Sequence, residues 1–303
     1  MNRRFFIRRA AVGGGLLVLP QLATAAASVR STRQLTILHT NDWHSQIDPF
    51  PDNGGRNANQ GGVLRRASLI RQIRREQPNV LLFDSGDIFQ GTPYFNFFLG
   101  ELEMKLMSQM GYDAGTIGNH DFDGGIENLA TQLGHATFPL LSANYDFTNT
   151  VLADRIEPYR VFERGGVRVG VFGLGIELKG LVPEELYGNT NYQNPLDRGN
   201  ETARHLRTRL KCDLVVCLSH LGYRYRNEKV DDVKLARASR HIDLILGGHT
   251  HTFMDQPAEV PNAEGLPVVI NQVGFAGLRL GRLDVTFGSK GERACVSCTN
   301  LRV

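Results

Sequence analysis

Short polar clusters follow five predicted strands, and this pattern restricts the fold more than any other feature of the chain. Apolar, β-branched segments predict buried strands at residues 35–40, 79–83, 113–117, 213–218 and 242–246. The clusters that follow these strands span residues 41–44, 84–87, 118–121, 219–220 and 247–251. In α/β sheets, ligand sites lie beyond the carboxyl ends of the strands. The sequence therefore predicts that the five clusters converge on one site.

Helical patterns separate these strands, at residues 63–75, 95–110, 126–133, 202–210 and 230–239. Strand–helix–strand alternation predicts an α/β fold, in one large domain over residues 34–303. Residues 160–173 read as a hairpin turning at Gly165-Gly166, and residues 181–199 as a long loop. The tail alternates as short antiparallel strands at 268–271, 279–287 and 293–302. A composition of 41% hydrophobic and 21% charged residues excludes disordered and fibrous classes.

Residues 1–27 have the features of an export signal. Arg3, Arg4, Arg8 and Arg9 form a basic start, residues 10–22 are apolar, and residues 23–27 are small. The Arg3-Arg4 pair resembles the twin-arginine type of export signal, so we expect a periplasmic or otherwise exported protein. Cleavage is expected after one of residues 25–27. The alternative is that this segment is only a flexible basic N-terminus. The apolar run is interrupted and shorter than a membrane span, so no stable membrane insertion is expected.

The net charge of +3 comes from this N-terminal segment. Taking its four arginines from the 34 basic residues of the chain leaves 30 against 31 acidic groups. Nucleic-acid binding needs a clustered basic footprint, and the chain has no basic run beyond the N-terminus. The sequence therefore argues against a nucleic-acid partner.

The converging clusters carry carboxylate, imidazole and amide groups but no thiolate. Such ligands suit divalent ions such as Zn, Mn, Fe, Co or Mg. Each cluster alone is also explained as a turn or a capping pair, but their joint occurrence after five strands predicts a metal centre. There are enough ligands for two ions if one carboxylate bridges. The candidate residues are Asp42, His44, Asp87, Asn119, His120, His220, His249 and His251.

The order of these motifs resembles the calcineurin-like metallophosphoesterases, specifically the branch of periplasmic 5′-nucleotidases and UDP-sugar hydrolases. The resemblance rests on Asp42-x-His44, Gly86-Asp87-x-x-x-Gly91, Gly118-Asn119-His120-Asp121, His220 and Gly247-Gly248-His249-x-His251, within residues 35–287. It implies a four-layer α/β/β/α sandwich with two metal ions between the facing sheets. One ion would be held by Asp42, His44, Asp87 and His251, and the other by Asp87, Asn119, His220 and His249.

The resemblance also implies a reaction, the hydrolysis of a phosphoester, most simply of a nucleotide. Two divalent ions (Zn, Mn, Fe or Co) would acidify a bridging water for in-line attack on phosphorus. His120 would stabilise charge or protonate the leaving group, and Asp123 would orient its imidazole. Asp121 stands where many relatives carry Glu, and little consequence is expected from this difference.

The chain is shorter than two-domain relatives of this family, in which a C-terminal domain binds the base. We expect no such specificity domain here, so the chain would be either a broad phosphoesterase or a catalytic subunit served by a separate C-terminal-domain polypeptide. Two alternatives remain: a thiosulfohydrolase on the same scaffold, and a catalytically silent metal-bearing subunit. The presence of His120 and Asp123 argues against the silent subunit.

Four cysteines lie in the C-terminal third, and three full disulfide connectivities are open to them. Cys217 lies within a predicted strand and is expected to be a buried residue. A zinc knot formed by all four is one alternative. A disulfide between Cys295 and Cys298 is another, although neighbours in an extended strand have awkward geometry for it.

Overall fold

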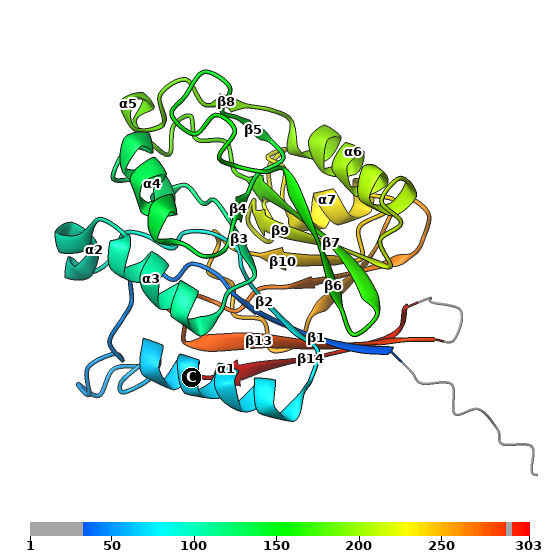
Figure 1. Ribbon diagram of the computed structural model, residues 1–303, viewed down its shortest axis with the longest axis horizontal. Coiled ribbons are helices and arrows are strands. Elements are labelled where there is room, and N and C mark those ends of the chain that lie inside the picture. Colours follow the sequence, from blue (N-terminus) through cyan, green and yellow to red (C-terminus); the bar gives the residue numbers. More distant parts are fainter. Residues whose placement is uncertain (1–32, 289–292) are drawn as a thin grey trace, which may run out of the picture. The chain divides into compact units, whose positions relative to one another are not determined.

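The computed structural model describes residues 33–288 and 293–303, so the predicted signal lies outside the described residues. Two six-stranded sheets lie face to face, with helices on their outer sides (Figure 1). Among the residues described, no helix combines the length and apolar character needed to cross a bilayer.

The first sheet has four parallel strands and an antiparallel edge contributed by the tail. Its order is β14 (Arg293–Arg302), β13 (Arg279–Phe287), β1 (Arg33–Thr40), β2 (Val80–Asp84), β3 (Ala114–Thr116), β4 (Leu140–Leu141). The tail strands at 279–287 and 293–302 are confirmed.

The second sheet has a parallel centre formed by β12, β10, β9 and β7, flanked by antiparallel edge strands. Its order is β11 (Ala258–Pro261), β12 (Pro267–Asn271), β10 (Leu244–Gly247), β9 (Leu214–His220), β7 (Val167–Gly175), β6 (Tyr159–Arg164). The predicted hairpin is β6–β7, with Gly165 and Gly166 both at positive φ in its turn. A separate two-stranded sheet pairs β5 (Tyr145–Asp146) with β8 (Asn191–Tyr192).

The α-helices are α1 (Val63–Glu76), α2 (Pro93–Phe98), α3 (Glu101–Met110), α4 (Ile126–Gln132), α5 (Glu184–Tyr187), α6 (Pro195–Thr208) and α7 (Asp232–Ala238). Two short 3-10 helices are η1 (His120–Phe122) and η2 (Leu133–His135). Apolar side chains of α1, α3 and α4 pack on the first sheet, and those of α6 and α7 pack on the second (Figure 1).

Alternation along the buried strands produces the layers. In β9, Val216 packs between the two sheets, whereas Val215 and Cys217 face the outer helices. In β1, Ile37 likewise lies between the sheets and Leu38 faces the helices. Because both faces of each sheet are buried, these strands are nearly continuous in apolar residues. The four-layer α/β/β/α prediction is confirmed.

The helix predicted at residues 95–110 is two helices. Leu99 has φ 52° and ends α2, and Gly100 has φ 101° before α3 begins. A Cβ at position 100 would collide with the ring of Phe89, so the chain turns where only glycine fits. Apolar periodicity continues across this break, which is why the sequence did not reveal it.

The long loop predicted at residues 181–199 is wrong, because this range contains α5, β8 and the start of α6. Helix α6 begins at Pro195, seven residues before the predicted helix start at 202. Asn194 caps α6, because its Oδ1 accepts from the backbone N–H of Leu196 at 2.8 Å and of Asp197 at 3.3 Å. Pro195 then occupies the first helical turn, where the missing N–H costs nothing.

The cysteines do not cross-link the described fold. Cys217 is fully buried in β9, as expected, and Cys212 is buried nearby. Cys298 is a free thiol, so the Cys295–Cys298 disulfide alternative is wrong.

Candidate metal centre

All five polar clusters meet where the carboxyl ends of the parallel strands of both sheets face each other, as predicted. Asp42 and His44 follow β1, Asp87 follows β2, and Asn119 follows β3. From the second sheet, His220 ends β9, and His249 and His251 follow β10.

Asp42, His44 and His251 form one group of candidate ligands. The Nε2 atoms of His44 and His251 lie 2.9 Å apart, and Asp42 Oδ1 is 3.3 Å from His251 Nε2. The Asp42 side chain is fully buried, whereas that of His251 is 40% exposed. The group therefore has a buried carboxylate and an open side.

Asp87, His220 and His249 form the second group. Asp87 Oδ2 lies 3.0 Å from His220 Nε2 and 3.9 Å from His44 Nε2, so this carboxylate stands between the two groups. Asn119 Oδ1 is 2.8 Å from His249 Nδ1, which places the amide beside the second group.

The residues fit two divalent ions. Within each group the ligand atoms lie within 4.8 Å of one another, and each group takes residues from both sheets. His220 Nε2 is buried and faces Asp87 Oδ2 at 3.0 Å without a well-aligned hydrogen bond, so a metal ion between the two atoms would give both a better partner. Carboxylates and imidazoles are suitable ligands for borderline divalent ions.

The backbone turns sharply at most of these positions. Asp42, His44, Asp87, His249 and His251 have φ values of 51°, 51°, 54°, 72° and 50°. Positive φ is uncommon outside glycine and marks functional positions when the surroundings hold it. Here the backbone N–H groups of Asp42 and His44 donate to the carbonyls of Gly86 and Asp87, at 2.9 and 3.0 Å.

Protonation of the metal-free centre is set by burial and by the central carboxylate. Burial would lower the pKa of His220, but the negative charge of Asp87 outweighs it and raises that pKa to about 10. Burial and the neighbouring His220 lower the pKa of His249 to about 4, so this ring is neutral at pH 7. His249 could therefore bind a metal ion without losing a proton, whereas His220 would have to release a proton first.

Asp121 holds the loop that carries Asp87. Its buried carboxylate accepts from the backbone N–H groups of Asp87, Ile88, Phe89 and Gly118, at 3.1, 2.8, 3.1 and 2.7 Å. Burial, together with the charge of Asp87, raises the pKa of Asp121 to about 7. Little consequence was expected from Asp in place of Glu at this position, because it is not a predicted metal ligand. That expectation overlooked the role of Asp121 in holding the loop. The only signal in the sequence was an acidic residue directly after Gly118-Asn119-His120.

His120 and Asp123 form the predicted pair beside the centre. His120 Nδ1 lies 2.8 Å from Asp123 Oδ2, and this hydrogen bond is the main cause that raises the pKa of His120. The His120 side chain is 38% exposed, and its ring lies 5.3 Å from that of His44. The imidazole is therefore next to the first group and open to solvent.

Sequence reasoning missed two aromatic contacts beside the candidate ligands. The ring of Phe275 stacks on His251 at 5.1 Å and 13°. Trp43 is buried between Asp42 and His44, with the Arg66 guanidinium 4.1 Å over its ring. Trp43 lies within the 41–44 cluster but was not among the candidate residues, and only the folded chain brings Phe275 to the loop after β10.

Known proteins resemble this chain over most of its length. A snake venom 5′-nucleotidase of Gloydius brevicauda is 33% identical over 92% of this chain and 49% of its own length. The 5′-nucleotidase of Rattus norvegicus is 33% identical over 86% of this chain and 47% of its own. The crystal structure of a 5′-nucleotidase precursor from Thermus thermophilus has a TM-score of 0.79 at 34% identity, over 89% of this chain and 54% of that one.

The chain thus spans about half the length of the curated relatives it matches. The family model described as calcineurin-like phosphoesterase matches residues 35–253, which include every candidate ligand. With its paired sheets and two ligand groups, the chain belongs to the calcineurin-like phosphoesterase family.

Proposed function

We propose that the chain hydrolyses phosphomonoesters, with a nucleotide as the substrate, and that two divalent metal ions assist the reaction. The observation that carries this proposal is the pair of ligand groups, which meet at Asp87, together with the solvent-exposed imidazole of His120 beside them. Similarity to 5′-nucleotidases supports the choice of nucleotide.

In this proposal, Asp42, His44 and His251 would hold one ion, Asn119, His220 and His249 would hold the other, and Asp87 would contribute to both. Two ions in such a site polarise the phosphate and make water a better nucleophile. Asp87, which lies between the two groups, would supply negative charge to both. Asn119 contributes a neutral oxygen, so the centre keeps a net attraction for an anionic substrate.

We assign the proton transfer to His120. Because its Nδ1 hydrogen bonds to Asp123, the imidazole is held in one orientation with Nε2 free to act. As the bond between phosphorus and the leaving oxygen breaks, His120 donates a proton from Nε2 to that oxygen. Asp123 orients the ring and favours its protonated form.

The proposal is tested by assaying the purified mature protein, loaded with Mn or Zn, against AMP, UDP-glucose, a cyclic nucleotide and an aryl phosphate. We expect turnover on at least one phosphomonoester, its loss after chelation and its return when metal is added back. Absence of turnover on all four, with two bound metal ions measured per chain, would contradict the proposal.

Domain organisation and location belong to the same proposal. We infer that residues 1–27 direct export and that residues 34–303 form the catalytic domain, because the leader has the basic, apolar and small-residue order of a signal. Cell fractionation of the wild-type chain and of an Arg3→Lys/Arg4→Lys variant tests export. Equal amounts outside the cytoplasm would argue against a twin-arginine signal.

The macromolecular partner that we propose is a polypeptide carrying a nucleotidase C-terminal domain. Its support is that the chain corresponds to about half of each nucleotidase it resembles. Adding such a polypeptide should increase activity on AMP more than on an aryl phosphate. Equal activity with and without it would argue against the partner.

A further inference from the structure

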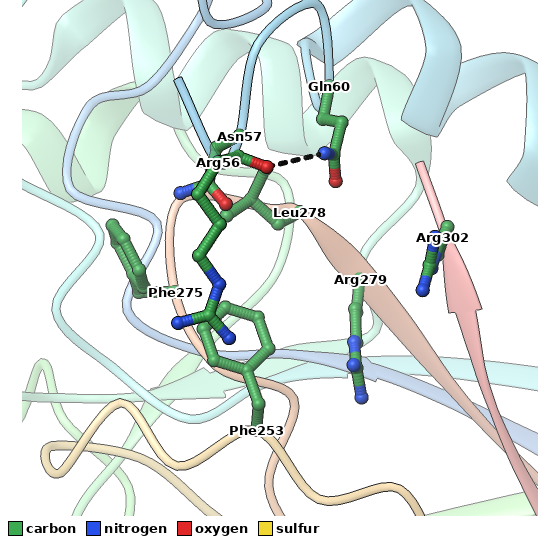
Figure 2. Close-up of a pocket in the computed structure, with 8 residues that line it drawn as sticks. All are labelled: Arg56, Asn57, Gln60, Phe253, Phe275, Leu278, Arg279 and Arg302. Atoms are coloured by element: carbon green, nitrogen blue, oxygen red, sulfur yellow. Dashed lines mark hydrogen bonds between the residues drawn. The ribbon is translucent and has the colours of Figure 1, made fainter. Parts of the chain in front are cut away.

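A basic cavity of about 310 Å³ lies next to the candidate metal centre (Figure 2). Its charged lining consists of Arg56, Arg279 and Arg302. Phe275 also lines the cavity and stacks on the candidate ligand His251, at a ring distance of 5.1 Å. The cavity and the metal centre therefore share a wall.

The three guanidinium groups come from distant parts of the chain. Arg56 lies in the loop between β1 and α1, Arg279 begins β13, and Arg302 ends β14. In Figure 2 the Arg56 and Arg279 side chains extend toward the part of the cavity that holds Phe253. The fold thus gathers positive charge here, although the chain beyond its N-terminal signal is nearly neutral.

Arg279 and Arg302 are direct partners in the antiparallel register of β13 and β14. Like charges directly opposite each other destabilise a strand pair. Asp255 forms an ion pair with Arg279 at 3.1 Å and offsets part of this repulsion. The Asp255 side chain, however, is 90% exposed. Within residues 33–288 and 293–303, Arg56 and Arg302 have no acidic partner, and no acidic residue lines the cavity. A bound anion would relieve this repulsion.

The aromatic residues favour an anion over a stacked ring as the ligand. One face of Phe253 is covered by the Arg279 guanidinium at 5.1 Å, and one face of Phe275 is covered by His251. The two rings contact each other edge to face at 5.8 Å and 71°, so they form no parallel slot for a base. Guanidinium groups, in contrast, match phosphate and carboxylate oxygens in geometry and charge.

We propose that this cavity binds a second anionic group of the substrate, remote from the phosphate that is hydrolysed. This inference rests on the proposed function. Phe275 and Phe253 separate the arginines from the metal ligand His251, so the two anionic groups belong to opposite ends of an elongated molecule. A nucleoside that carries phosphates at two positions has this chemistry.

The test compares AMP with adenosine 3′,5′-bisphosphate, which differ by one phosphate. In the metal-loaded wild-type protein, we expect a lower KM for the bisphosphate. The double variant Arg56→Gln/Arg302→Gln should raise that KM about tenfold, with kcat and the KM for AMP unchanged. A matched control, Arg204→Gln/Arg237→Gln, removes the same charge from exposed positions on α6 and α7 and should change neither KM.

Equal wild-type KM values, or an equal effect of the double substitution on both substrates, would overturn the inference. A direct binding measurement separates this failure from failure of the proposed function. Calorimetric titration of the metal-free protein with inorganic pyrophosphate should show binding that Arg56→Gln/Arg302→Gln weakens and the control pair retains. Such a result supports the anion site even if neither nucleotide is hydrolysed, whereas unchanged or absent binding contradicts it.

Discussion

Among single residues, His120 offers the clearest separation of chemistry from metal binding. His120→Asn keeps a polar side chain but removes the proposed proton donor. We expect kcat to fall by roughly two to four orders of magnitude, with both metal ions retained. Steady-state kinetics combined with metal analysis of the same preparation measures the two effects separately.

His135→Asn is the matched control, because His135 lies in η2 and belongs to neither ligand group. It should leave kcat and metal content as in the wild type. If His120→Asn turned over as fast as this control, the assignment of proton transfer would be wrong.

Asp84, at the end of β2, makes the stability of the protein depend on pH. Its buried carboxyl accepts from Thr40 Oγ1 at 2.6 Å and from the backbone N–H of Gly86 at 2.9 Å. Burial nevertheless raises its pKa from an ordinary 3.8 to about 7. Between these two pH values the unfolded chain loses the proton while the folded protein keeps it, so rising pH favours unfolding.

We therefore expect the free energy of unfolding of the wild type to fall, relative to Asp84→Asn, as pH rises from about 4 to about 7. The change has an upper limit on the order of 4 kcal/mol. Urea unfolding of the metal-free proteins across this range measures it, with the exposed Asp154→Asn as control. Parallel curves for wild type and Asp84→Asn would show that the carboxyl titrates normally.

Among secondary-structure elements, the residues after β3 approach the loop after β2 so closely that position 118 has no room for a side chain. A Cβ on Gly118 would collide with the backbone N and the Oδ1 of Asp87. Gly118→Ala must therefore displace the shared carboxylate. We expect lower metal content and a kcat/KM reduced about a hundredfold, measured by metal analysis and kinetics.

Gly134→Ala controls for the substitution itself, because a Cβ at position 134 meets no atom within 4 Å. It should leave both quantities unchanged. Wild-type metal content and activity in Gly118→Ala would show that the close approach does not position Asp87.

The elements that the sequence predicted well are those whose two faces are buried. Strands such as β9 and β10 are short apolar runs that end in polar residues, so their positions and their carboxyl ends could be predicted. Convergence of the candidate residues followed from strand direction alone. The break at Leu99 could not be predicted, because it depends on contact between Gly100 and Phe89, which precedes α2.

Supporting contacts of the site were also beyond the sequence. The position of Asp121 suggested a neighbour of a ligand, but its hydrogen bonds to four backbone N–H groups exist only in the folded loop. Phe275 lies outside every motif, and only folding brings its ring against His251. Two-residue strands such as β4 and β5 carry no detectable periodicity.

For the whole molecule, stability depends on the apolar layer between the two sheets. Leu246 of β10 is fully buried in that layer. Leu246→Ala should cost about 2 to 5 kcal/mol, because the facing sheets cannot close around the missing atoms. Leu64→Ala, at a position 79% exposed on α1, should change stability by less than about 0.5 kcal/mol.

Chemical unfolding of the metal-free proteins, followed by circular dichroism, measures both values. Equal stability of the two variants would contradict the assignment of this layer as the main core.

Each ligand group takes its members from both sheets, and this has a consequence for the order of folding. His44 and His251 are 207 residues apart in the chain, yet their ring nitrogens lie 2.9 Å from each other. A growing polypeptide cannot complete either group until β10 has emerged from the ribosome and the second sheet has docked on the first. Contacts of such long range form late, so metal capture should follow the docking of the two sheets, and a bound ion marks a chain in which this docking has taken place.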